Sequence, residues 1–204
     1  NQLLNYLPQN LIKLSVRSTL FNCTIHNLPS SLKSLQLYLN KFNEPLNSLP
    51  QLDQLLISCK KFNQSLSNLP QSLKGLEIMY GNSFKQSFDY LPSNLRSLTI
   101  SINHFNSPLD NLPQSLTLLR IIQCGKFNQP LINLPKSLHI LSILTCKSFN
   151  QPLDNLLNDL HSLILRECTD FNQPLNHLPI HLHSLEIDCH NYNQPMNHLP
   201  PNLN

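Results

Sequence analysis

A nine-residue motif recurs through the chain at intervals of 20 to 22 residues. Its copies include FNEPLNSLP from Phe42, FNSPLDNLP from Phe105, FNQPLINLP from Phe127 and FNQPLNHLP from Phe171. A repeat this short cannot bury its apolar side chains by itself, so those side chains must pack against the neighbouring repeats. The recurrence therefore predicts a solenoid, in which each turn contacts only the turns before and after it.

A second motif, LxxLxL, lies between successive copies of the first. Examples are SLKSLQL at residues 31–37, NLRSLTI at 94–100 and HLHSLEI at 181–187. Continued to Asn40 and Phe42, the first example matches the leucine-rich-repeat frame LxxLxLxxNxL. We expect nine such segments, between Leu11 and Ile187, to form short parallel strands on the concave face of a right-handed superhelix. At roughly 4.8 Å between strands, the sheet would be about 40 Å long.

Proline recurs at two fixed places in the segments between the expected strands. One set is Pro45, Pro108, Pro130, Pro152, Pro174 and Pro195, and the other is Pro8, Pro29, Pro50, Pro70, Pro92, Pro113, Pro135, Pro179 and Pro200. Proline lacks an N–H and holds its predecessor extended. The convex segments are therefore predicted to be extended or short 3₁₀ turns. We therefore expect residues 1–204 to form one β-rich, leucine-rich-repeat-like solenoid of about nine repeats that is incomplete at both ends.

These motifs resemble those of the FNIP repeat family, a leucine-rich-repeat-like family named for its FNxP motif and found in slime moulds and giant DNA viruses. The FNxP motif is intact from residues 42, 105, 127, 149 and 171. Departures are Thr24, Ser65, Ser87 and Leu157 in place of Pro, Lys85 in place of Asn and Tyr192 in place of Phe. Members often carry an F-box ahead of the repeats, which implies substrate recognition for a ubiquitin ligase. This sequence contains no such helical segment.

The asparagine that follows the motif's first residue is interpreted as structural. It occurs as Asn22, Asn43, Asn63, Asn106, Asn128, Asn150, Asn172 and Asn193. Its amide can donate and accept, so it can bond backbone groups at the turn or the asparagine of the next repeat. A ligand-binding role for one of these residues is the alternative.

Five of the six cysteines share one position, three residues before the next Phe or Tyr. They are Cys59, Cys124, Cys146, Cys168 and Cys189, and Leu39 and Ile102 occupy the same position elsewhere. A position shared with Leu and Ile predicts a buried packing site for a free thiol. Reduced thiols favour the cytoplasm, or the host cytoplasm for a viral protein. Zinc binding and disulfides are the alternatives.

His139, His161 and His183 occupy one position in three consecutive repeats, and we expect their side chains to form a column. A metal site needs three or four ligands around one point, whereas a column sets them in a row. The same position holds Lys33, Asp53, Lys74, Arg96 and Thr117 elsewhere, as an exposed edge would. No nucleophile is paired with an oriented base, and no glycine-rich phosphate loop occurs. We therefore expect no catalysis, metal or cofactor.

The net charge of +3 is too small to indicate a nucleic-acid or membrane partner. Nucleic-acid binding is the least favoured hypothesis, because acidic residues interrupt the basic ones on the expected sheet. The basic residues are Lys13, Arg17, Lys33, Lys74 and Arg96, and the acidic ones are Asp53 and Glu77. No apolar run approaches the roughly 18 residues of a membrane-spanning helix.

Variable positions on the expected concave sheet are the candidates for function. Leu118, Ile122, Ile140, Leu144 and Ile164 form a contiguous apolar group there, with Arg96, Arg120, Arg166, His139 and His161 around it. Apolar clusters with a polar rim indicate partner sites. The preferred hypothesis is a non-catalytic module that binds a protein or peptide on this face. The alternative for the apolar group is that a neighbouring subunit or a missing terminal segment covers it. The alternative function is a structural or assembly component, a self-associating or virion-surface solenoid whose copies associate through uncapped ends.

Overall fold

The computed structural model describes residues 4 and 6–203, and its core is one parallel sheet of nine strands in sequence order. The strands are β1 (Lys13–Ser18), β2 (Ser34–Leu39), β3 (Gln54–Ser58), β4 (Gly75–Met79), β5 (Ser97–Ser101), β6 (Leu118–Ile122), β7 (Ile140–Leu144), β8 (Ser162–Arg166) and β9 (Ser184–Asp188). Each strand begins one residue before the second apolar position of LxxLxL. The predicted solenoid and its concave parallel sheet are therefore confirmed.

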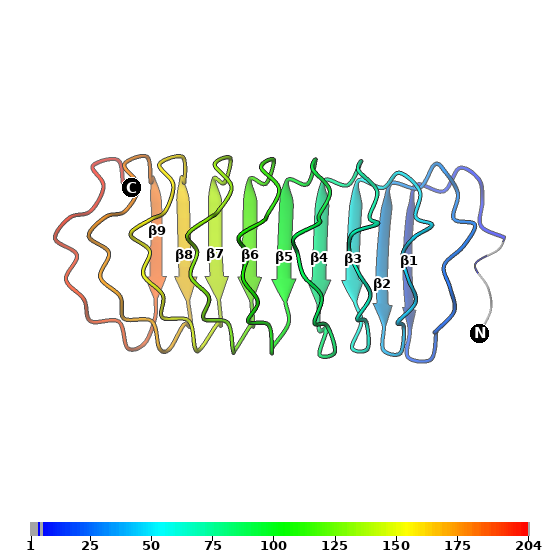
Figure 1. Ribbon diagram of the computed structural model, residues 1–204, viewed down its shortest axis with the longest axis horizontal. Coiled ribbons are helices and arrows are strands. Elements are labelled where there is room, and N and C mark those ends of the chain that lie inside the picture. Colours follow the sequence, from blue (N-terminus) through cyan, green and yellow to red (C-terminus); the bar gives the residue numbers. More distant parts are fainter. Residues whose placement is uncertain (1–3, 5, 204) are drawn as a thin grey trace.

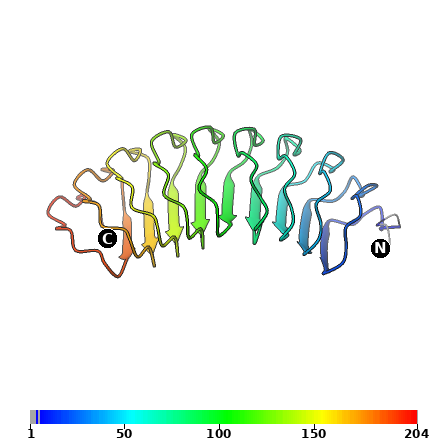
Figure 2. The ribbon, with the colours of Figure 1, turned by 60° about the horizontal axis from the view of Figure 1, so that its bottom comes forward.

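The molecule is a curved arc (Figures 1 and 2). The strands lie side by side along its inner side, and the return segments cover its outer side, following a right-handed path from one strand to the next. Among the described residues none is helical. This arrangement places alternate strand residues in the core and on the concave surface, as the two-residue period of a strand requires.

The core is a continuous column of leucine, isoleucine and phenylalanine that runs the length of the arc. On β2, for example, Leu35 and Leu37 are fully buried, whereas Ser34, Gln36 and Tyr38 face outward and are half-buried. Full burial of a side chain of this size contributes roughly 1.5–3 kcal/mol relative to exposure. Stability is consequently distributed along the stack, because every turn supplies the same set of apolar contacts.

The second set of prolines ends the return segment with a tight turn. The amide of Leu32 donates to the carbonyl of Pro29, three residues earlier, at 3.0 Å, and the same bond joins Leu138 to Pro135. Leu157 replaces the proline in one repeat, yet Leu160 still donates to its carbonyl at 3.0 Å. The expected 3₁₀ geometry is thus limited to isolated turns, and the turn does not depend on the proline ring.

The first aromatic residue of each motif stacks on its counterpart in the next repeat. Ring centroids of Phe127 and Phe149 are 5.8 Å apart, and those of Phe149 and Phe171 are 5.9 Å apart, with the rings nearly parallel. The regular stack is altered in the middle of the arc, where Phe88 packs edge-on against Phe105. Offset rings at these separations attract one another in addition to burying apolar area.

The motif asparagines form a ladder on the outer side of the arc. The side-chain oxygen of Asn128 accepts from the amide of Asn150 at 2.9 Å, and that of Asn150 accepts from the amide of Asn172 at 3.0 Å. The side chain of Gln173 also donates to Asn150. The structural interpretation of these asparagines is confirmed, because their amides satisfy backbone groups between repeats.

Four turns after strands contain one extra residue, and each extra residue has a left-handed backbone. They are Tyr80, Gln123, Thr145 and Glu167, with φ between 54° and 56°. Each donates its amide to the last residue of the following strand, as Thr145 does to Arg166 at 2.8 Å. None of the four is glycine, and a β-branched residue such as Thr145 rarely adopts this conformation.

Candidate functional site

The apolar group predicted on the concave face is contiguous in the structure. Register pairs Leu118 of β6 with Ile140 of β7, and Ile122 of β6 with Leu144 of β7, while Ile164 extends the group onto β8. All five side chains face outward and are half-buried, because their neighbours in the row cover part of each. We call these five residues the β6–β8 patch.

A row of alternating small and large residues crosses the middle of the patch. Thr99, Arg120, Ser142 and Ile164 follow one another across β5–β8 in register. Thr99 is 6% exposed and Ser142 3% exposed, whereas Arg120 is exposed. Among the described residues, no carboxylate lies within ion-pair distance of Arg120. This guanidinium is therefore available to an acidic group on a partner.

Arg166, the second arginine of the predicted rim, is bound within the chain. Its Nε donates to Oε1 of Glu186 on β9, an ion pair that sequence reasoning missed. The hydrogen bond and the charge of Glu186 raise the pKa of Arg166, with a smaller contribution from Asp188. Arg166 thus borders the patch as part of a neutral pair. Arg96 lies directly before β5, at the edge where the strands begin, and is exposed.

The predicted histidine column is present at the same edge of the sheet. Ring centroids of His139 and His161 are 5.0 Å apart, and those of His161 and His183 are 5.4 Å apart. All three rings are exposed. Within the described residues, no group of three or more His, Cys, Asp or Glu side chains could hold a metal ion. His139 and His161 flank the patch next to the start of β7 and β8.

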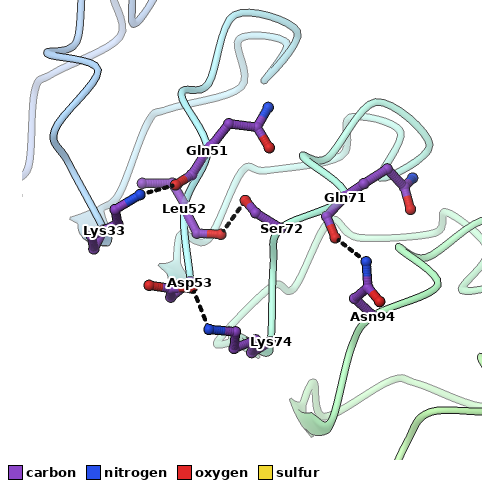
Figure 3. Close-up of polar contacts among 8 residues, drawn as sticks. All are labelled: Lys33, Gln51, Leu52, Asp53, Gln71, Ser72, Lys74 and Asn94. Atoms are coloured by element: carbon purple, nitrogen blue, oxygen red, sulfur yellow. Dashed lines mark hydrogen bonds and ion pairs between the residues drawn. The ribbon is translucent and has the colours of Figure 1, made fainter.

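The column occupied by these histidines carries alternating charge toward the other end of the arc (Figure 3). Nζ of Lys74 lies 2.9 Å from Oδ1 of Asp53, and Nζ of Lys33 donates to the carbonyl of Gln51. The hydrogen bond from Lys74 lowers the pKa of Asp53, and the charges of Lys74 and Lys33 lower it further. Because Asp53 separates the two lysines, this edge does not form a continuous cationic strip for a phosphate backbone.

Five cysteines occupy the predicted packing position beneath the turns. Cys59, Cys124, Cys146, Cys168 and Cys189 are buried and free of disulfides. The thiol of Cys146 donates to the carbonyl of Ile121 at 3.4 Å, and that of Cys168 to Ile143 at 3.4 Å. Burial raises the pKa of Cys59 to about 11 and that of Cys168 to about 12. The predicted buried packing position of these five thiols is therefore confirmed.

Thiol reactivity should distinguish the half-buried Cys23 from this buried set. In native protein treated with iodoacetamide at pH 8, we expect alkylation of Cys23 and protection of Cys59 and Cys168, because reaction requires an accessible thiolate. Denatured protein, as the control, should be alkylated at all six cysteines. Peptide mass spectrometry reads both samples, and rapid alkylation of Cys168 in native protein would contradict the buried assignment.

Two features of the concave face were not anticipated from the sequence. The left-handed residues Tyr80, Gln123, Thr145 and Glu167 lie where the strands end, and the Thr145 hydroxyl donates to Glu167 at 2.9 Å. The available signal for these four residues was the repeat length, because each of their repeats has one more residue between the end of the strand and the next Phe. The second feature is Arg17, whose guanidinium carbon lies 4.9 Å from the ring centroid of Tyr38. The available signal for this contact was the repeat register, which places Arg17 of β1 directly beside Tyr38 of β2.

The fold and the concave surface define a leucine-rich-repeat-like solenoid, a class of protein that generally serves protein interaction. A solved structure described as "The crystal structure of CroV588 a novel circular LRR protein structure" is similar to it, with a TM-score of 0.74 and 32% sequence identity over 97% of this chain. CroV588 comes from a giant virus, and this chain spans 33% of its length. No protein-family model matches the chain, and no curated protein matches it. Membership of the FNIP family therefore stays a prediction from the motifs.

Proposed function

We propose that the β6–β8 patch binds a protein or peptide partner without catalysing a reaction. The observation that carries the proposal is five half-buried aliphatic side chains that lie together on adjacent strands of the concave face. Leu118 pairs with Ile140 and Ile122 with Leu144, while Ile164 lies in the middle row on β8. Aliphatic side chains bring no nucleophile, acid or base, but they lose contact with water when a partner covers them.

Charge around the patch favours a partner with acidic residues beside its apolar ones. Arg120 is exposed and has no carboxylate within ion-pair distance among the described residues, whereas Arg166 is paired with Glu186. Arg96, His139 and His161 add cationic or hydrogen-bonding groups at the edge where the strands begin. A carboxylate placed over Arg120 would form a charge-assisted hydrogen bond at the centre of the interface.

A narrower form of the proposal is substrate recognition by an F-box type ubiquitin-ligase adaptor in the cytoplasm. The FNxP motifs support the adaptor role, because proteins with such repeats often carry an F-box. The buried, free cysteines support a reducing compartment. Within residues 4 and 6–203, no helix is long and apolar enough to cross a membrane.

Selection of a displayed peptide library on the immobilised protein tests the proposal. The double variant Ile140→Asp, Leu144→Asp should bind the selected peptides with at least tenfold lower affinity, because two carboxylates would replace apolar contacts in the patch. A tenfold change in affinity is about 1.4 kcal/mol. The matched control is Ser34→Asp, Gln54→Asp, which adds the same charge at outward positions of β2 and β3. Equal peptide affinity in all three proteins would contradict the proposal.

The alternative is an assembly role, in which another copy covers the patch. The contiguous apolar side chains support it as well, because a second copy over them would remove them from water. Light scattering over a concentration series separates the two functions. An assembly that dissociates in the Ile140→Asp, Leu144→Asp variant would favour self-association over a peptide partner.

A further inference from the structure

A hollow opens on the concave face in the half of the arc that contains β1–β4, away from the β6–β8 patch. It has a volume of about 680 Å³ and is lined by residues at and just after the ends of β1–β4, among them Arg17, Tyr38, Ser58, Met79 and Tyr80. Small-molecule sites in proteins are typically hollows of roughly 300–1,000 Å³. This hollow is therefore large enough for a ring-sized group.

Differences in side-chain size create the hollow. Register sets Arg17, Tyr38, Ser58 and Met79 in one row across β1–β4. Ser58 is the smallest of the four and lies between the larger side chains of Tyr38 and Met79, so the row is lowest there. The extra left-handed residue after β4, Tyr80, is 54% exposed and forms part of the wall. The turn after β3 has no such extra residue to fill the space.

Arg17 gives the hollow its charge. Its guanidinium lies over the ring of Tyr38, a cation–π contact that holds a long, flexible side chain in place. No carboxylate is among the lining residues, and Glu77 of β4 belongs to the neighbouring row. The remaining polar lining is neutral and includes Asn40, Ser58 and Ser18. Among the described residues, Arg17 therefore has no acidic partner to neutralise it.

From this combination we infer that the hollow binds an aromatic ring that carries an anionic group. A guanidinium offers a fork of N–H donors that matches the oxygens of phosphate or carboxylate. Tyr80 and Met79 offer apolar surface for the ring. A phosphorylated tyrosine side chain and an aromatic carboxylate share this chemistry. The site is separate from the β6–β8 patch and does not depend on the function proposed for that patch.

Titration of the protein with phenyl phosphate, followed by NMR, tests the inference. We expect saturable shifts in the Arg17 and Tyr38 signals, and benzoate as a second probe distinguishes a preference for phosphate from one for carboxylate. Phenol lacks the charge and inorganic phosphate lacks the ring, so both should bind at least fivefold more weakly than phenyl phosphate.

Two variants alter the charge and the space independently. Arg17→Gln removes the charge, and Ser58→Leu fills the lowest point of the row while keeping Arg17. Each variant should lower the affinity for phenyl phosphate at least fivefold. Lys136→Gln removes an exposed positive charge from the segment between β6 and β7, outside both sites, and should leave binding unchanged. Undiminished binding by Arg17→Gln or Ser58→Leu would overturn the inference, as would phenol or inorganic phosphate binding as tightly as phenyl phosphate.

Discussion

Replacement of Phe149 by alanine should lower the free energy of unfolding by about 3–5 kcal/mol. The side chain is fully buried, and its ring lies between those of Phe127 and Phe171 at centroid distances of 5.8 and 5.9 Å. Truncation would remove the ring's own burial and both stacking contacts. It would also leave a cavity in the core between β7 and β8, with the rings of Phe127 and Phe171 on either side.

Urea unfolding monitored by circular dichroism measures this effect. Ile132→Ala is the matched control, because Ile132 is 57% exposed on the same side of the arc and its truncation should cost less than about 0.5 kcal/mol. A shallower denaturant slope in Phe149→Ala would show that the turns on either side of the cavity unfold separately. Equal stability of the two variants would contradict the role of the aromatic stack.

The arrangement of the fold was predictable because the spacing of a few residues determines it. Once Phe171 sets the register, Leu185 and Ile187 face the core and Glu186 between them faces outward, as the equivalent residues do in the other turns. Parallel strands paired in register then place equivalent residues side by side. That is why the contiguity of Leu118, Ile140 and their neighbours could be predicted by counting alone.

What escaped prediction depends on side-chain size and on single-residue insertions. The ion pair between Arg166 and Glu186 joins residues at different positions of adjacent strands, so counting along a row does not reveal it. The left-handed backbone of Thr145 follows from one extra residue, and no glycine marks the place. The hollow beside Arg17 exists because Ser58 is small, a volume difference that the apolar pattern does not record.

Loss of the Asn150 side chain should be the next most destabilising change, at about 1–3 kcal/mol for Asn150→Ala. Its oxygen accepts from the amide of Asn172 and from the side chain of Gln173, both at 3.0 Å. Alanine would leave both donors without this acceptor. Asn193→Ala is the control, because Asn193 accepts from no later repeat within the described residues and its loss should cost less than about 0.5 kcal/mol. Urea unfolding compares the two variants.

The ladder also contains a natural interruption that tests the same interaction in the opposite direction. Lys85 occupies an asparagine position; its amide donates to Asn63 at 2.9 Å, but its side chain has no oxygen to accept from Asn106. Lys85→Asn should therefore raise the free energy of unfolding by about 0.5–1.5 kcal/mol, the usual net value of one hydrogen bond. Stabilisation by Lys85→Asn together with destabilisation by Asn150→Ala would assign the effect to the amide oxygen. If Lys85→Asn left stability unchanged, solvent would satisfy the Asn106 amide equally well, and the cost of Asn150→Ala would have to come from packing.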